Sequence, residues 1–158
     1  MKIREVIKPD NPHLAIIIRG VLKEMKVPTK GTAYADKELD NMYQAYSVPR
    51  SKYFVVEFGD QILGGAGIMQ LNKEAENICE LQKMYLHPKA RGKGVGSNLL
   101  KLCLSFAREN NFSLCYLETM PYMLDAQELY RKNDFVYINK PMGDTGHYSC
   151  SVWMTKEL

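Results

Sequence analysis

The sequence predicts one mixed α+β domain in which helices cover a sheet. The 158 residues have the length of a single domain, 1–158, and contain no internal repeat or linker-like stretch. Two segments have the apolar periodicity of amphipathic helices, and another two have the turn and residue types of a β-hairpin. Because hairpins and helical crossovers follow one another along the chain, we expect a mixed sheet.

The first half of the chain predicts a strand, two helices and a hairpin. Apolar residues recur at helical spacing from Leu14 to Met25, and this period stops before Pro28. The Gly59-Asp60 pair has the residue types of a two-residue hairpin turn. In chain order, the expected elements are a strand at Ile3–Ile7, a helix at Leu14–Met25, a helix from the cap residue Asp36 to about Tyr46, and strands at Tyr53–Phe58 and Gln61–Leu71.

The second half of the chain alternates strands with helices. Its clearest helix begins at Val95, because apolar residues line one face as far as Phe106. The expected elements are a strand at Ile78–Leu86, a helix at Val95–Arg108, a strand at Leu114–Thr119, a helix at Asp125–Asn133, and strands at Phe135–Asn139 and Tyr148–Met154 around the turn Gly143–Gly146.

Composition and charge exclude several classes of protein. With 46% hydrophobic and 25% charged residues, the chain is neither disordered nor collagen-like. A net charge of +3 is too small to indicate a nucleic-acid partner, and no apolar stretch approaches the ~20 residues of a membrane span. No secretory apolar core is visible, so we expect a cytoplasmic protein. The four cysteines form no C-x-x-C pair and lie far from the histidines, so we expect reduced thiols and no metal.

The most informative segment is a strand that runs through a glycine-rich loop into the Val95 helix. The loop carries Gly92, Gly94 and Gly96, which let the backbone approach a ligand closely. The first amides of a helix have no internal partner and lie at the positive end of its dipole, so they bind phosphate. Arg91 and Lys93 add positive charge. We therefore expect a phosphate or pyrophosphate here; the alternative is a solvated basic loop.

The loop pattern distinguishes among phosphate-binding families. Neither the P-loop pattern nor the dinucleotide pattern G-x-G-x-x-G is present. The spacing Arg91-x-x-Gly94-x-Gly96 resembles the pyrophosphate signature [QR]-x-x-G-x-[GA] of the Gcn5-related N-acetyltransferase (GNAT) family. Met84-Tyr85-Leu86-His87-Pro88 and Ala126-x-x-Leu129-Tyr130-x-Lys132-x-x-Phe135 also resemble segments of that family, so the resemblance spans roughly residues 78–139.

The resemblance implies a fold and a co-substrate. The fold is a mostly antiparallel sheet of six to seven strands, flanked by about four helices and splayed between the fourth and fifth strands. Acetyl-CoA lies with its pantetheine in this gap, where an amide near Met84 or Tyr85 polarises the thioester carbonyl. The implied cofactor-binding residues are Met84, Tyr85, Leu86, Arg91, Gly92, Lys93, Gly94, Val95, Gly96 and Ser97.

Two catalytic residues are implied as well. Glu80 is the candidate base for the acceptor ammonium, and on a regular strand Glu80, Gln82, Met84 and Leu86 share one face. It can equally be a solvent-facing residue or an ion-pair partner, in which case Glu118 is the next candidate carboxylate. Tyr130 matches the family's proton donor to the departing thiolate; the alternative is a core tyrosine.

The sequence departs from the family pattern at two positions. Met123 stands where the family commonly has Asn, which removes an expected hydrogen bond to the cofactor. Asp134 stands where the family has Gly, and because Asp tolerates left-handed backbone angles the end of the preceding helix can survive.

The acceptor is the least determined part of this prediction. Tyr34, Glu118 and His147 are its candidate contacts. We expect direct acetyl transfer to a small primary amine, such as an amino acid, amine metabolite or antibiotic, by a monomer or homodimer. The alternatives are acetylation of a peptide or protein amino group, and an acyl-CoA-binding sensor module without turnover.

Overall fold

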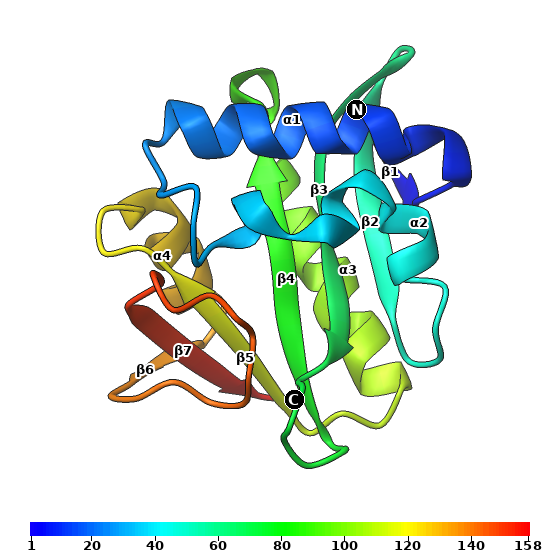
Figure 1. The fold of residues 1–158 in the computed structure, drawn as a ribbon. Helices are drawn as coiled ribbons and strands as arrows, with labels where there is room; N and C mark the ends of the chain where they lie inside the picture. The colour runs from blue at the N-terminus through cyan, green and yellow to red at the C-terminus, as the bar shows by residue number, and fades with distance from the viewer.

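A single seven-stranded sheet forms the centre of the molecule, with strand order β1-β2-β3-β4-β5-β7-β6 (Figure 1). The computed structural model describes residues 1–158. The strands are β1 (Lys2–Glu5), β2 (Lys52–Phe58), β3 (Gln61–Gln70), β4 (Ile78–Leu86), β5 (Leu114–Thr119), β6 (Val136–Ile138) and β7 (Val152–Glu157). The helices are α1 (Asn11–Glu24), α2 (Met42–Ala45), α3 (Val95–Glu109) and α4 (Leu124–Arg131), with 3-10 turns η1 (Lys8–Asp10), η2 (Ala33–Ala35), η3 (Lys37–Asp40) and η4 (Pro88–Ala90). None of the helices has both the length and the apolarity needed to cross a membrane.

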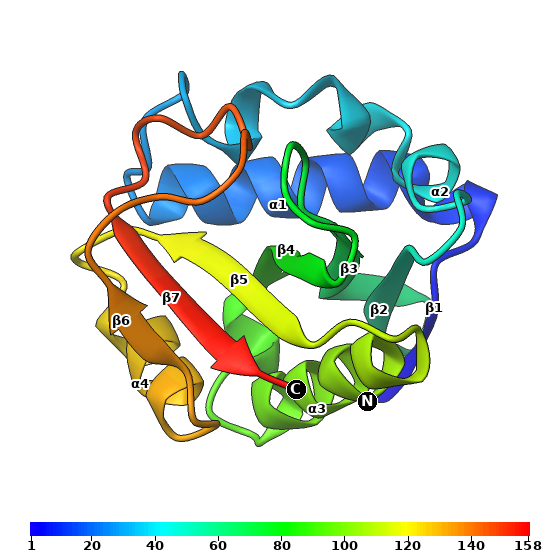
Figure 2. The same cartoon turned by 90° about the horizontal axis from the view of Figure 1, so that it is seen from below.

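Helices cover both faces of the sheet (Figure 2). On one face, α1 buries Leu14, Ile18 and Leu22 in a core shared with α2 and β2. On the other face, α3 and α4 contribute to a larger core that includes Leu99 and Tyr130. The helical periods read from the sequence therefore mark the buried faces of α1 and α3 correctly.

The sheet opens between its fourth and fifth strands. β4 and β5 form the sheet's only parallel pair, and their pairing runs from Ile78–Leu114 only to Glu80–Tyr116. Beyond this point β4 continues to Leu86 and β5 to Thr119 without pairing. The predicted mostly antiparallel sheet, its four helices and its splay are thus confirmed.

A β-bulge interrupts β4 just beyond the splay. Gly67 pairs with Gln82 and Gly65 pairs with Tyr85, so Lys83 and Met84 share one partner position. Lys83 has a left-handed φ of 50°, as a bulge residue can. The bulge reverses the alternation of side chains: Leu81 before it and Met84 after it both pack against the α3-side core. The prediction that Glu80, Gln82, Met84 and Leu86 share one face is therefore wrong.

Glycines in β3 make room for the side chain that holds this bulge. A Cβ on Gly65 or Gly67 would lie 2.6 Å from the Tyr53 ring, so no larger residue fits at either position. The Tyr53 hydroxyl crosses β3 and donates a 2.9 Å hydrogen bond to the Lys83 carbonyl. The small residues of one strand thus fix the irregular geometry of the next.

Two predicted elements differ in the structure. The helix expected from Asp36 to Tyr46 is instead η3 followed by the single turn of α2. Asp36 caps no helix with its side chain, because its carboxylate binds His147 and Lys83. The last strand is Val152–Glu157 rather than Tyr148–Met154, since the segment before it hydrogen-bonds across to the loop at Gly31.

Candidate active site

The splay of the sheet holds a cavity of about 560 Å³, which we call the splay cavity. β4 contributes Met84–Leu86 to its wall and the splayed end of β5 contributes Glu118 and Thr119. α4 closes it with Ala126, Leu129 and Tyr130, and the glycine-rich loop before α3 lies at one end. The segments that carry the sequence motifs therefore meet around one space.

The loop at the end of the splay cavity presents a row of free amides. Gly94 is the N-cap of α3 with a left-handed φ of 74°, and no side chain caps the helix. The backbone amides of residues 92–97 donate to no acceptor in the protein. A Cβ at Gly92 or Gly94 would meet nothing within 4 Å. This open, uncapped helix start fits a diphosphate.

Most of the predicted cofactor-binding residues line this cavity. Arg91, Gly92, Gly94, Gly96 and Ser97 do so, together with the three residues of β4. Lys93 and Val95 do not: the Lys93 ammonium donates to the Lys89 carbonyl, and the Val95 side chain belongs to the core. Of these two residues, only the backbone amides are free to bind a ligand.

The Arg91 side chain is less available to bind a phosphate than the sequence suggested. Its guanidinium forms two hydrogen bonds of 3.0 and 2.9 Å to the Glu24 carboxylate at the end of α1, and its Nε donates to the Leu86 carbonyl. The positive charge therefore lies at the cavity but is already paired with a carboxylate.

Tyr130 has the properties of a proton donor. The residue is only 6% exposed and lines the splay cavity. Burial raises the pKa of the Tyr130 phenol, so it stays protonated at neutral pH. Nearby, Met123 lines the cavity in place of a hydrogen-bonding Asn. Asp134 takes the predicted left-handed φ, 65°, just past the end of α4.

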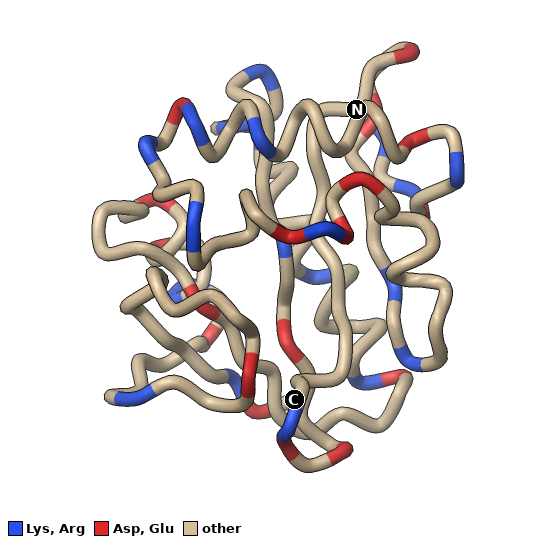
Figure 3. Tube along the Cα trace, viewed as in Figure 1, with Lys and Arg blue, Asp and Glu red and all other residues tan.

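A second, polar cavity of about 550 Å³ lies over β4 on the α1 side of the sheet. It is formed by Asp36–Glu38, the β3–β4 turn, Glu80–Lys83 and the loop around His147. Figure 3 shows acidic and basic residues alternating along the segment that crosses in front of β4. We call this space the polar cavity. Lys83 lines both cavities, so they adjoin at the bulge.

Glu80 lies in the polar cavity with an altered acidity. It is 4% exposed and accepts a 2.6 Å hydrogen bond from the Gln82 amide, which in turn accepts one from the Tyr46 hydroxyl. Burial, opposed by the Gln82 bond and reinforced by the charge of Glu118, raises the pKa of Glu80 to about 7. A carboxyl with this pKa can accept and release a proton at neutral pH.

Asp36 joins the segments around Glu80. Its carboxylate lies 3.0 Å from His147 Nε2 and 3.0 Å from the Lys83 ammonium. Burial raises its pKa, but the His147 bond and the Lys83 charge outweigh this and hold the pKa of Asp36 below its usual value. Burial lowers the pKa of His147, and the bond to Asp36 reverses this, so the pKa of His147 is raised. The sequence indicated Asp36 only as a helix cap and gave no signal for Lys83.

One remaining candidate, Tyr34, lies away from both cavities, and one cysteine lies in the splay cavity. Tyr34 lines neither cavity; its ring packs beside α1, with the Lys23 ammonium 5.8 Å from its centre. Cys150 does line the splay cavity, but burial and the charges of Glu118 and Glu80 raise the pKa of its thiol to about 12. A thiol that stays protonated is a poor nucleophile, which argues against an acyl-cysteine intermediate.

Fold and site together define a class of protein. A sheet that splays beside an uncapped helix start can hold a coenzyme A thioester, and a buried carboxyl with a pKa near 7 adjoins the same gap. This is the arrangement of an acyltransferase that uses a coenzyme A thioester.

Comparison with known proteins identifies the family. The Acetyltransferase (GNAT) family matches residues 20–135. The chain is 42% identical over 156 residues to the uncharacterised N-acetyltransferase YjgM of Escherichia coli K12, covering 98% of this chain and 93% of that protein. The chain therefore belongs to the GNAT family and is an N-acetyltransferase.

Solved structures support the same fold. A GNAT-family acetyltransferase of Staphylococcus aureus Mu50 superposes with a TM-score of 0.83 at 20% identity, covering 99% of this chain and 98% of that one. The PaiA N-acetyltransferase of Thermoplasma acidophilum, solved with coenzyme A, gives 0.76 at 18% identity over 99% and 98%.

Proposed function

We propose that this N-acetyltransferase moves the acetyl group of acetyl-CoA directly to the primary amine of a small molecule. The observation that carries the proposal is the junction of the two cavities. The splay cavity ends beside the β4 bulge, and the polar cavity begins there with a carboxyl that titrates near neutral pH. A thioester entering from one side and an amine from the other would meet at this point.

Each part of the junction has a role in this proposal. The amides of residues 92–97 bind the diphosphate, and an amide at Met84 or Tyr85 polarises the thioester carbonyl. Glu80, directly or through a water, takes a proton from the acceptor ammonium. Tyr130 gives a proton to the departing sulfur. Acetyl-CoA supplies the activated acetyl group.

The composition of the polar cavity supports a small hydrophilic acceptor. Nearly all of its lining is polar, and its charged groups are carboxylates, lysines and one histidine. Its volume of about 550 Å³ matches the size range of small-molecule sites. A peptide amino group is the second candidate, because the cavity reaches the exposed β3–β4 turn at Asn72 and Lys73.

A thiol-release screen tests the proposal. The protein is incubated with acetyl-CoA and a panel of amino acids, amine metabolites, aminoglycosides and short peptides, and free CoA is measured with a thiol reagent. Saturable release with a small primary amine is expected. Release with peptides alone would move the function to the second candidate. Tight acetyl-CoA binding with no release for any acceptor would favour a sensor module.

A further inference from the structure

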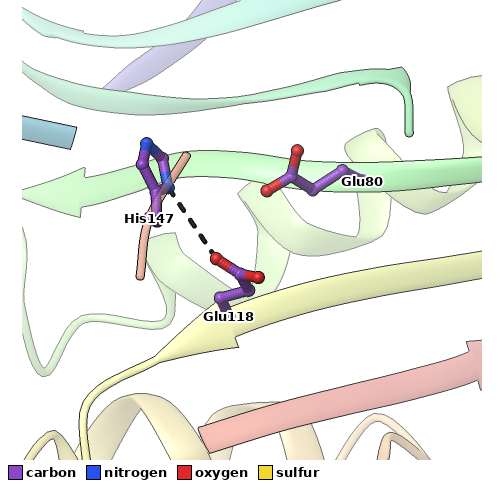
Figure 4. Close-up of side chains that lie close together, drawn as sticks. All are labelled: Glu80, Glu118 and His147. Atoms are coloured by element: carbon purple, nitrogen blue, oxygen red, sulfur yellow. Dashed lines mark ion pairs between the residues drawn. The ribbon is translucent and has the colours of Figure 1, made fainter. Parts of the chain in front are cut away.

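Three side chains from separate elements converge where the two cavities meet (Figure 4). Glu80 comes from β4, Glu118 from β5 and His147 from the loop before β7. One acceptor atom of each lies within 4.8 Å of the other two, and His147 Nδ1 is 3.9 Å from Glu118 Oε2. Glu80 and His147 line the polar cavity, whereas Glu118 lines the splay cavity. The cluster therefore spans the boundary between the two.

The orientation of each group leaves an acceptor directed at the others. Glu80 accepts from Gln82 through Oε2, and its Oε1 accepts no hydrogen bond within the protein; because no buried side-chain oxygen lacks a partner, Oε1 is open to the polar cavity. His147 Nε2 faces Asp36, so the Nδ1 lone pair is free when the ring is neutral with its proton on Nε2. The raised pKa of His147 favours the imidazolium, so an ammonium would bind in place of its Nδ1 proton.

Two hydroxyl groups donate hydrogen bonds to the Glu118 carboxylate and fix its orientation. Tyr116 donates a 2.7 Å hydrogen bond to Oε1, and Thr145 donates a 2.8 Å hydrogen bond to Oε2. Each carboxylate oxygen can accept a second bond.

The two carboxyl groups of the cluster have no lysine or arginine partner. Neither Glu80 nor Glu118 forms an ion pair with a lysine or arginine. The nearest buried cation, Lys83, is already bound to Asp36 and Glu38. His147 is the one titratable base beside Glu118, so an ammonium placed among the three groups would compensate the charge of the carboxylates when both are ionised.

The spacing of the three acceptor atoms admits an ammonium. An ammonium donates three hydrogen bonds of about 2.7–2.9 Å in tetrahedral directions, which places its acceptors about 4.4–4.7 Å apart. Zinc at about 2.0–2.2 Å would require ligand atoms about 3.3–3.6 Å apart. The 3.9 Å separation of His147 Nδ1 and Glu118 Oε2 lies between these two ranges, and the 4.8 Å limit for the trio leaves room for an ammonium.

We propose that Glu80, Glu118 and His147 form a cradle that binds the acceptor as a protonated primary ammonium, each side chain accepting one of its N–H bonds. This deepens and rests on the proposed function. It assigns Glu118 and His147 to acceptor binding and restricts the acceptor to primary amines that enter charged. It also brings the amine nitrogen to the splay cavity beside Glu80, the base that removes one of its protons.

Binding of simple ammonium ions to the protein–CoA complex tests the cradle without a known acceptor. Isothermal titration calorimetry compares propylammonium chloride with tetramethylammonium chloride, which has the same charge but no N–H donor. We expect propylammonium to bind at least about ten-fold more tightly. Equal affinity for the two ions would overturn the cradle.

Variants locate the binding. Glu118→Gln keeps the size of the side chain but removes its charge, and we expect it to weaken propylammonium binding roughly ten- to hundred-fold. His147→Gln is a second, independent variant with the same expected direction. Glu109→Gln, a carboxylate at the end of α3 outside both cavities, is the matched control. Unchanged binding in both cradle variants, or a zinc site that excludes propylammonium, would contradict the cradle.

The cradle and the proposed function can fail separately. If a small amine is acetylated but its KM is unchanged in Glu118→Gln, the cradle is wrong and the proposed function stands. If propylammonium binds as predicted but no small amine is acetylated, the cradle is supported and the proposed function is wrong.

Discussion

The two cavities lie side by side but are lined by different parts of the chain. The splay cavity presents backbone: the anion site that we propose is a run of free amides at residues 92–97, all within one loop and helix start. The polar cavity presents side chains, drawn from four segments between Asp36 and His147. A ligand site made of backbone amides can be predicted from a short stretch of sequence. A site made of side chains depends on which distant segments the fold brings together.

The largest effect is expected from placing a charge in the backbone site. Gly94→Asp puts a carboxylate among the free amides, so it competes with the diphosphate and repels it. We expect acetyl-CoA affinity to fall roughly a hundred-fold or more, measured by calorimetry.

Gly59→Asp is the matched control for this substitution. Gly59 has a similar left-handed φ, 59°, with open space at its Cβ, and it lies in the β2–β3 turn outside both cavities. Its variant carries the same backbone strain without the charge at the site. Acetyl-CoA binding by Gly94→Asp at the affinity of this control would refute the role of the loop.

Glu80→Gln tests the chemistry of the polar cavity. Loss of the base should lower kcat by roughly 10²- to 10⁴-fold. In the unmodified protein the rate should rise with pH through about 7, as Glu80 loses its proton, and this limb should vanish in the variant. A variant whose pH profile matches that of the unmodified enzyme would remove Glu80 as the base.

The same substitution should stabilise the protein. Burial raises the pKa of Glu80 from 4.5 to about 7, so the folded state holds this proton more tightly than the unfolded state. Ionised Glu80 therefore costs about 3 kcal/mol of folding free energy above pH 7, and the cost disappears as the pH falls toward 4.5. Urea unfolding at pH 8 and pH 4.5 should show the gain only at the higher pH.

The contrast between the backbone site and the side-chain site explains which parts of the molecule could be predicted from the sequence. The loop from Arg91 to Gly96 was found because its glycines, its cations and the following helix are adjacent in the chain. Tyr130 was predicted because the segment from Ala126 to Phe135 resembles a motif of the GNAT family. These motifs are local in sequence, and the splay between the fourth and fifth strands was implied by the family resemblance that they carry.

The polar cavity could not be assembled from local patterns. The bulge at Lys83 depends on the Tyr53 side chain, which crosses the glycines of β3. No pattern within the β4 sequence itself predicts the bulge. Asp36 has the residue type of a helix cap, yet its partner His147 lies 111 positions away. Side-chain chemistry built from such contacts follows from strand register and loop packing, which periodicity does not specify.

Tyr130→Phe sharpens the comparison within the splay cavity, because it changes chemistry and leaves the backbone site intact. We expect kcat to fall roughly ten- to hundred-fold, since the departing thiolate loses its proton donor, while acetyl-CoA affinity stays nearly the same. Tyr43→Phe, outside both cavities, is the control. Unchanged turnover in Tyr130→Phe would leave Tyr130 as a core residue only.

The smallest effect is expected at Arg91, and this is where backbone and side-chain recognition can be separated most directly. The Arg91 guanidinium is paired with Glu24 at 2.9 Å and is partly exposed, so it adds little to the charge that the diphosphate meets. Arg91→Gln should weaken acetyl-CoA binding by no more than about five-fold, with a lower dependence on salt concentration. Glu24→Gln, which frees the guanidinium, should tighten binding by a similar or smaller factor. A loss in Arg91→Gln as large as that in Gly94→Asp would mean that a side-chain charge, and not the amides, carries the anion site.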